Sequence, residues 1–376
     1  MAHQFDRKMA RLALEICRYT YAAGVGDSED AAEMAEALAY ITTHSNPITK
    51  ESKPGKPIPI NGGRTSFACV VSYADRNVVS YMGTKTQFDI HELKESLNRL
   101  KQAKGFELFT TMREEVKADI AIVKKFRESL KDWGQNGKAR PVAFQLDAEH
   151  LGKPAGATVD PLEGRVHHGF LDELKAVQRQ IVATLIEHGS DPRLGKDARP
   201  VLVTGHSQGG AEAALATRAL AAAGFNVEVT YTFAAPRTGT PEFAASVKTP
   251  VHRIEFGDDI VPHLPPTLIR TLLEELIVEH KLLLRMLTLL DDLENALSEI
   301  RDFGYVGLGP LCYGEPKAKK IHIGLSDADE KALFDRRLEF LRKNPKHWGD
   351  HHHLAGMTAE VTAKPSKRGN YTALVS

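Results

Sequence analysis

Ser207 lies in the run GHSQGG (205–210), the pattern in this sequence best suited to carry chemistry. A serine hydroxyl is a weak nucleophile until a nearby histidine accepts its proton. A Gly-x-Ser-x-Gly turn between a strand and a helix lifts the serine out of a sheet, where a histidine can reach it. The following helix would direct its first backbone amides, including that of Gln208, toward a developing oxyanion. The run therefore predicts acyl transfer with Ser207 as the nucleophile.

The segments on either side of this turn have the compositions that a strand and a helix require. PVLVTG (200–205) is continuously apolar, which is typical of a buried strand in a mostly parallel sheet. AEAALATRALAAAG (211–224) is rich in small side chains and predicts a helix that packs closely on that sheet. A bare Gly-x-Ser-x-Gly is a weak signal, and an ordinary glycine-rich turn is the alternative. The flanking strand and helix favour the nucleophile.

A serine of this type needs an acid and a histidine, which follow it in that order along an α/β-hydrolase chain. The strand-like run VHRIEF (251–256) leads into Asp258 and Asp259, and either carboxylate could orient the base. The alternative is that these aspartates only cap a turn. His263 is too close in sequence to the acid to reach back, so the run 351–353 is the natural source of the base.

Strands and helices alternate through the middle of the chain, which predicts an α/β fold with a mostly parallel central sheet flanked by helices. Besides the strand before Ser207, the expected strands are 65–74, 77–83, 141–146, 227–236 and 251–256. We expect a single domain over 1–376 that begins with amphipathic helices over 1–45.

Helical insertions are expected over 89–136 and 267–302, and at least one of them should act as a lid or cap. The first is highly charged. The second carries leucine stripes so apolar that they need a partner. That partner could be the domain itself, an acyl pocket that the segment covers, or a dimer or lipid surface. The sequence leaves open which insertion is the lid.

Several separated segments, in order along the chain, resemble the class 3 lipases, the fungal-type triacylglycerol lipase family. They are SYMGT (80–84), VHHGF (166–170), GHSQGG (205–210), YTFAAPRTGTPEF (231–243) and GDDIVPHLPP (257–266). The resemblance implies an α/β-hydrolase fold and the hydrolysis of carboxylic esters, foremost acylglycerols, without a cofactor or metal. Phospholipase A and aromatic-acid (feruloyl-type) esterase activity are alternatives on the same scaffold, and a non-catalytic lipase-like binding protein is a third.

The resemblance also assigns the acid and the base. Alignment on the Val-Pro pair makes Asp259, rather than Asp258, the acid. His352 is the preferred base, because an apolar residue follows it two positions later, as in the family. His353 is the second choice and His351 the third. The implied triad is Ser207, Asp259 and His352.

Two donors are assigned to the oxyanion hole by the same resemblance. Thr84 stands where the family has a hydroxyl-bearing oxyanion residue, so its amide and hydroxyl would join the backbone amide of Gln208. His167 matches a residue that is usually structural, and His206 occupies a variable position of the serine turn, so neither is expected to be catalytic. The histidines at 351–353 lack the Cys or carboxylate spacing that would complete a metal site.

Composition limits the partners. Lys+Arg and Asp+Glu both number 49, so no overall field attracts nucleic acid, and a transient contact with a lipid surface would need a local apolar patch. Cys17, Cys69 and Cys312 are far apart and predict free thiols. The N-terminal stretch lacks the plan of a secretory signal, and no apolar run approaches the ~18 residues that span a bilayer. We therefore expect a cytoplasmic protein or one exported without a Sec signal, of undetermined oligomeric state.

Overall fold

The computed structural model of the chain describes residues 4–25, 30–43, 55–63, 66–83, 140–264, 303–315, 320–343 and 351–352. Some of the features predicted from the sequence lie in residues that the structure does not describe. Both helical insertions, 89–136 and 267–302, lie outside the described residues, as do Thr84 and His353.

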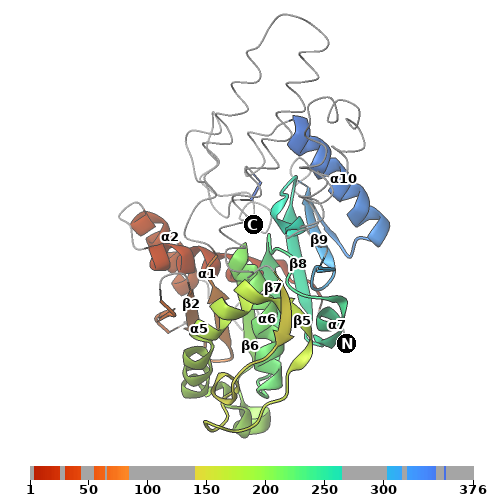
Figure 1. Cartoon of the computed structure of the whole chain (residues 1–376). Coiled ribbons are helices and arrows are strands. Elements are labelled where there is room, and N and C mark those ends of the chain that lie inside the picture. Colours follow the sequence, from red (N-terminus) through yellow and green to blue (C-terminus); the bar gives the residue numbers. More distant parts are fainter. Residues whose placement is uncertain are drawn as a thin grey trace, which may run out of the picture.

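A sheet of eight strands forms the centre of the fold, in the order β1-β2-β3-β6-β7-β8-β9-β10 (Figure 1). The strands are β1 (Ile58–Asn61), β2 (Phe67–Ser72), β3 (Asn77–Tyr81), β6 (Val201–His206), β7 (Val227–Phe233), β8 (Val251–Phe256), β9 (Leu311–Glu315) and β10 (Lys320–Ile323). From β3 to β9 neighbouring strands pair in parallel, and β1, β2 and β10 are antiparallel. The predicted α/β fold with a mostly parallel central sheet is confirmed.

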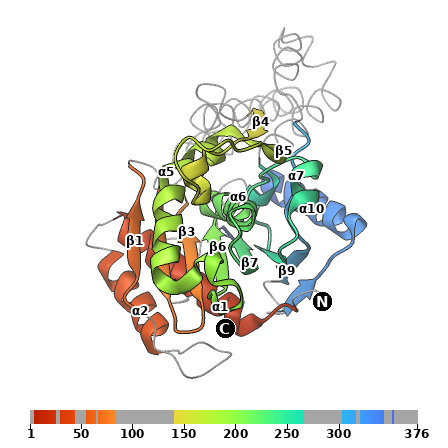
Figure 2. The same cartoon turned by 90° about the horizontal axis from the view of Figure 1, so that it is seen from below.

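Helices cover both faces of this sheet (Figure 2). α1 (Arg7–Val25) packs on one face with α2 (Asp30–Thr43) beside it, and α5 (His168–Leu185) and α6 (Gln208–Ala222) pack on the other. Alternation along β6 shows why: Val201 and Val203 point into the α5–α6 core, whereas Leu202 points into the α1 core. Both faces are buried, so the strand is apolar at every one of these positions.

The remaining elements surround this core. They are β4 (Pro141–Phe144) and β5 (Leu162–His167), which form a separate antiparallel pair, α7 (Pro241–Ser246), α10 (Asp327–Lys343), and the short helical turns η1 (Ala148–Leu151), η2 (Ile186–Ser190), η3 (Pro192–Asp197) and η4 (Val261–His263). Among the described helices, none is both long enough and apolar enough to cross a membrane.

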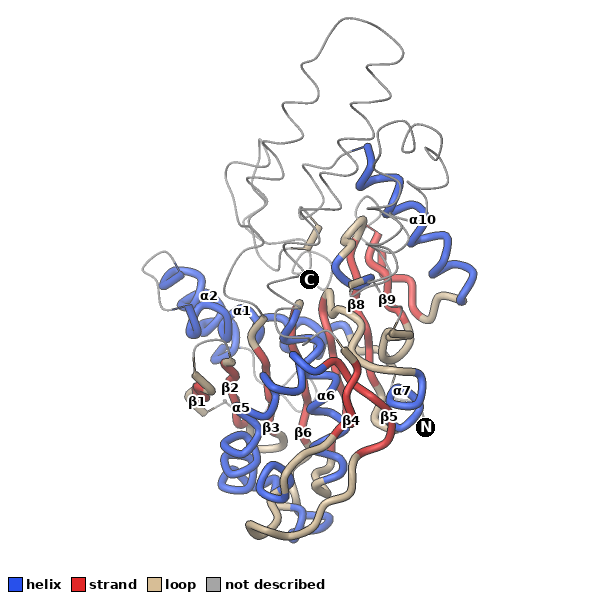
Figure 3. Tube along the Cα trace, in the orientation of Figure 1, coloured by secondary structure: helices blue, strands red, loops and turns tan. Residues whose placement is uncertain are grey.

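Parallel pairing brings the carboxyl ends of the central strands to one edge of the sheet, and Figure 3 shows these strands side by side. His206 at the end of β6 is opposite Phe233 of β7, and Phe233 is opposite Ile254 of β8. The turn after β6 and the loop after β8 therefore emerge at the same edge of the sheet, with β7 between the two strands. They carry Ser207 and Asp259.

The cysteines are buried and free, as the sequence predicts. Burial raises the pKa of the Cys17 thiol to about 11, and those of Cys69 and Cys312 to about 12. All three remain protonated at neutral pH, and a protonated thiol is a poor nucleophile. The buried thiols are therefore poor candidates for a nucleophile.

Candidate active site

Ser207 occupies a strained turn between β6 and α6. Its backbone has φ 55° and ψ −130°, a conformation that non-glycine residues rarely adopt. The flanking glycines permit the tight packing of this turn. A Cβ atom on Gly205 would lie 2.0 Å from the Gly209 carbonyl oxygen, and one on Gly209 would lie 2.2 Å from the Tyr81 carbonyl oxygen. The Gly-x-Ser-x-Gly spacing is thus a requirement of close backbone approach.

His352 joins this serine to a buried carboxylate. Its Nε2 atom lies 2.9 Å from Ser207 Oγ, and its Nδ1 atom lies 3.0 Å and 3.2 Å from the two carboxylate oxygens of Asp259. Asp259 is fully buried and accepts a further hydrogen bond of 3.0 Å from the Val261 backbone N–H. A buried carboxylate accepts from Nδ1–H, which leaves Nε2 free to take a proton from the serine. The structure therefore brings Ser207, His352 and Asp259 together in the order that a triad requires.

The neighbouring residues that the sequence left as alternatives are engaged differently. The Asp258 backbone N–H donates to His351 Nδ1 over 2.8 Å, and the Asp258 carboxylate accepts from Arg336 Nε over 3.1 Å. His351 thus pairs with Asp258, whereas Asp259 is the carboxylate that holds His352. His353, the second choice for the base, lies outside the described residues.

Gln208, the predicted oxyanion donor within the described residues, is the first residue of α6. Amides in the first turn of a helix have no acceptor inside that helix and carry a partial positive charge. The Gln208 side chain is held in place by its Nε2 atom, which donates to Glu212 Oε1 over 3.1 Å. Burial raises the pKa of Glu212 well above its usual value, and the neighbouring Glu173 raises it further by a smaller amount.

Two residues that the sequence did not single out for the site form a hydrogen-bonded path to the backbone of His352. His206 Nε2 lies 2.8 Å from the His352 carbonyl oxygen, and Tyr21 on α1 lies 3.1 Å from His206 Nδ1 through its hydroxyl. A carbonyl can only accept, so His206 carries its proton on Nε2 and accepts from the Tyr21 hydroxyl at Nδ1. His206 therefore helps to hold the backbone of His352 in place. No local pattern in the sequence indicates this role.

Helix α10 anchors the loop that carries the acid. The fully buried Arg337 donates to Glu255 Oε2 over 2.6 Å and to the Gly257 carbonyl over 3.1 Å. Its guanidinium also lies 2.8 Å from His263 Nε2. Burial, together with Arg337, holds the pKa of His263 well below its usual range. His263 is thus a neutral acceptor within this anchor, in line with the expectation that it is not the base.

His167 has a structural contact of the kind expected for it. It caps the N-terminus of α5, where its Nδ1 atom accepts from the Phe170 backbone N–H over 3.3 Å. Burial lowers the pKa of His167 to about 3, so the ring is neutral and able to accept.

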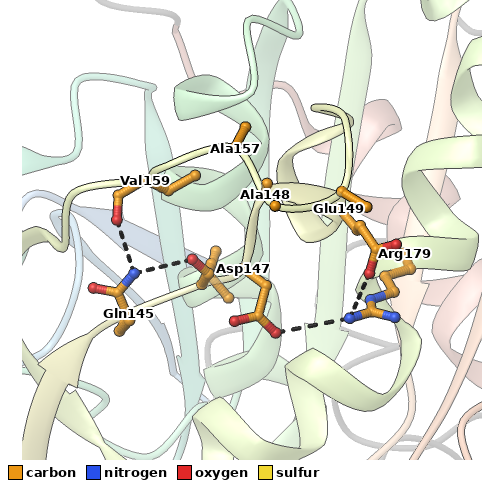
Figure 4. Close-up of a pocket in the computed structure, with 10 residues that line it drawn as sticks. Gln145, Asp147, Ala148, Glu149, Ala157, Val159 and Arg179 are labelled. Atoms are coloured by element: carbon orange, nitrogen blue, oxygen red, sulfur yellow. Dashed lines mark hydrogen bonds and ion pairs between the residues drawn. The ribbon is translucent and has the colours of Figure 1, made fainter.

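The structure also contains a hollow with several charged side chains in its lining (Figure 4). Its volume is about 350 Å³, and it is lined by the loop 145–159 and by Arg179, which pairs with Glu149 over 2.7 Å and with Asp147 over 3.7 Å. None of the triad residues lines it. Within the part of the chain that the structure describes, no three His, Cys, Asp or Glu side chains gather in a way that could hold a metal ion.

Comparison with known proteins gives matches in sequence and in structure. A lipase of Rhizomucor miehei is 34% identical over 155 residues, which are 39% of this chain and 38% of the relative. A secreted mono- and diacylglycerol lipase 1 of Fusarium solani is 38% identical over 107 residues, 27% of this chain and 30% of that protein. These matched regions thus span about a third of each curated relative.

Among solved structures, a triacylglyceride lipase of Rhizomucor miehei is similar with a TM-score of 0.46 and 18% identity, covering 88% of this chain and 91% of the other. A mutant of MDLA from Penicillium cyclopium has a TM-score of 0.47 and 15% identity, covering 88% and 89%. The family model described as "Lipase (class 3)" matches residues 78–269, just over half of the 376 residues. On that match, the chain belongs to the class 3 lipase family.

Proposed function

We propose that this protein hydrolyses carboxylic esters, foremost acylglycerols, through an acyl-enzyme formed on Ser207. The observation that carries the proposal is the continuous hydrogen-bonded path from Ser207 through His352 to the buried Asp259. A strained serine at a strand-to-helix turn, within reach of an oriented imidazole, is the arrangement that activates a hydroxyl for attack on an ester carbonyl.

The reaction proceeds in two transfers. Ser207 Oγ attacks the ester carbonyl as His352 Nε2 takes its proton, and Asp259 stabilises the imidazolium while it holds Nδ1–H. The tetrahedral oxyanion is stabilised by the Gln208 amide and by Thr84, the second predicted donor. His352 then returns the proton to the departing alcohol. A water molecule, deprotonated by the same imidazole, releases the carboxylic acid and restores Ser207.

The acylglycerol class is favoured by the relatives, whose names describe them as lipases and, in one case, as a mono- and diacylglycerol lipase. Such substrates collect at lipid surfaces, so we infer that the protein makes transient contact with one. The Fusarium solani relative is described as secreted, which favours export over a cytoplasmic location for this chain. A non-catalytic binding protein would not need the three intact contacts at Ser207, His352 and Asp259.

Rates on a series of p-nitrophenyl esters from acetyl to palmitoyl, followed by emulsified triacylglycerol and by phosphatidylcholine vesicles, test this proposal. We expect ester hydrolysis that Ser207→Ala abolishes without loss of the folded state, and acylglycerol turnover faster than phospholipid turnover. Faster phospholipid cleavage would replace the acylglycerol assignment with phospholipase A. Full activity of Ser207→Ala would refute the assignment of Ser207 as the nucleophile. The absence of any ester hydrolysis by the parent protein would refute the proposed enzymatic function.

A further inference from the structure

The acid loop and the histidine loop meet as two adjacent pairs of residues. His352 Nδ1 lies 3.0 Å from the Asp259 carboxylate. One residue earlier in both segments, the Asp258 backbone N–H donates to His351 Nδ1 over 2.8 Å. Consecutive residues of one loop therefore contact consecutive residues of the other, and a shift by one residue would break both contacts.

The His351 ring is itself held from two sides. Phe256 at the end of β8 meets it edge-on, with ring centroids 5.6 Å apart, and Phe340 on α10 stacks on it at 5.8 Å. Arg336, also on α10, holds the Asp258 carboxylate at 3.1 Å. The contact between His351 and Asp258 is thus built on two fixed elements, β8 and α10.

These contacts bear on the base because His352 must keep two distances at once, 2.9 Å to Ser207 Oγ and 3.0 Å to Asp259. Its backbone is fixed on the carbonyl side by the 2.8 Å hydrogen bond from His206. On the N-terminal side of His352, the ring of the preceding residue, His351, accepts a hydrogen bond from the Asp258 backbone N–H. Since a misplacement of about 1 Å in a catalytic group can cost about a hundredfold in rate, this second anchor matters for catalysis.

We propose that His351 is a positioning residue that sets the register of the histidine pair against Asp258–Asp259 and so holds the His352 ring between Asp259 and Ser207. It acts as a hydrogen-bond acceptor at Nδ1, not as a base. The expected effect of His351 on turnover rests on the proposed ester hydrolysis, whereas its effect on the position of the His352 ring does not.

Two substitutions separate the acceptor from the ring. His351→Phe keeps an aromatic ring against Phe256 and Phe340 but removes the acceptor, whereas His351→Asn loses the ring and keeps an acceptor oxygen close to the position of Nδ1. His322→Phe is the matched control, because His322 is a partly buried histidine on β10 that stacks on Tyr313 at 6.2 Å.

For each full-length variant we would measure kcat, KM and melting temperature. The proton NMR signal of His352 Nδ1–H, which bonding to the Asp259 carboxylate moves far downfield, reports the geometry independently of turnover.

We expect His351→Phe to lower kcat by about tenfold to a hundredfold with little change in KM, and to shift or broaden the downfield signal. His351→Asn should recover most of kcat and the signal, and His322→Phe should leave both unchanged. A His351→Phe variant that keeps kcat and the signal would overturn the proposal. So would equal losses in His351→Phe and His351→Asn with an unaltered signal, which indicate a general packing defect. If the parent protein hydrolyses no ester, the proposed function fails, and the signal in His351→Phe still decides the role of His351.

Discussion

Replacing Asp259 by asparagine should disable the base while leaving the fold intact. Asp259 Oδ1 accepts from the Val261 backbone N–H at 3.0 Å, and Oδ2 lies 3.0 Å from His352 Nδ1. In the variant, the amide oxygen would remain on the Val261 N–H, so the amide nitrogen would face His352. Nδ1 must then accept, which moves the imidazole proton to Nε2, 2.9 Å from Ser207 Oγ. An Nε2 that carries a proton cannot take one from the serine.

The size of the effect follows from this change of tautomer. Substitutions of this kind in serine triads lower kcat by about 10⁴-fold with the geometry kept. At ~1.4 kcal/mol for each factor of ten, that corresponds to about 5.5 kcal/mol of transition-state stabilisation. Since the amide keeps the bond to Val261 and matches the volume of the carboxylate, KM and the melting temperature should change little.

The assay is the steady-state rate on a soluble p-nitrophenyl ester at neutral pH, with circular dichroism to verify folding. Asp258→Asn is the informative comparison, because the Asp258 carboxylate pairs with Arg336 at 3.1 Å and its backbone N–H is unaffected. The loss in Asp258→Asn should be far smaller than in Asp259→Asn. A variant at Asp259 that retains activity within tenfold of the parent would refute the tautomer argument, and a larger loss at Asp258 would exchange the roles of the two residues.

Two further predictions concern the surroundings of the triad. Tyr21→Phe removes the hydroxyl that donates to His206 Nδ1 over 3.1 Å, and should lower kcat several-fold and the free energy of unfolding by about 1 kcal/mol, measured by urea denaturation. An unchanged kcat would show that His206 needs no fixed tautomer. Burial raises the pKa of Glu212 well above its usual value of 4.5, so the stability that this group provides is full below that value and is lost as pH rises through the folded-state pKa. Glu212→Gln cannot ionise and can still accept from Gln208, so its melting temperature relative to the parent should increase as pH rises above 4.5. A difference that is flat or falls with pH would contradict a raised pKa for Glu212.

The central elements of the site were predictable because they depend on local patterns. A continuously apolar strand, a glycine-bounded serine and a small-residue helix specify the turn at Ser207 from neighbouring residues alone. The contacts of Tyr21, Arg337 and His351 were not predictable, because each of these residues meets its partner only after distant elements pack together. No spacing rule along the chain connects them.

The edges of the sheet were also missed, for physical reasons. The prolines near β1 are typical of an extended connection outside a sheet, yet Pro59 pairs with Cys69 in the edge strand, where a missing N–H is tolerated. The stretch 151–165 is rich in glycine and proline, which is typical of a loop, but β5 begins within it at Leu162. Strands β9 and β10 were not predicted, although β9 extends the parallel block beside β8.

Covalent labelling with a fluorophosphonate tests the central claim most directly, because this reagent is attacked by an activated serine and stays on it. The reacted protein is digested and the modified residue located by mass spectrometry. A Ser207 activated by His352 at 2.9 Å should take up a single phosphonyl group, and Ser207→Ala should take up none. Labelling of Ser207→Ala at the parental rate, or an adduct on a different residue of the parent, would contradict the account.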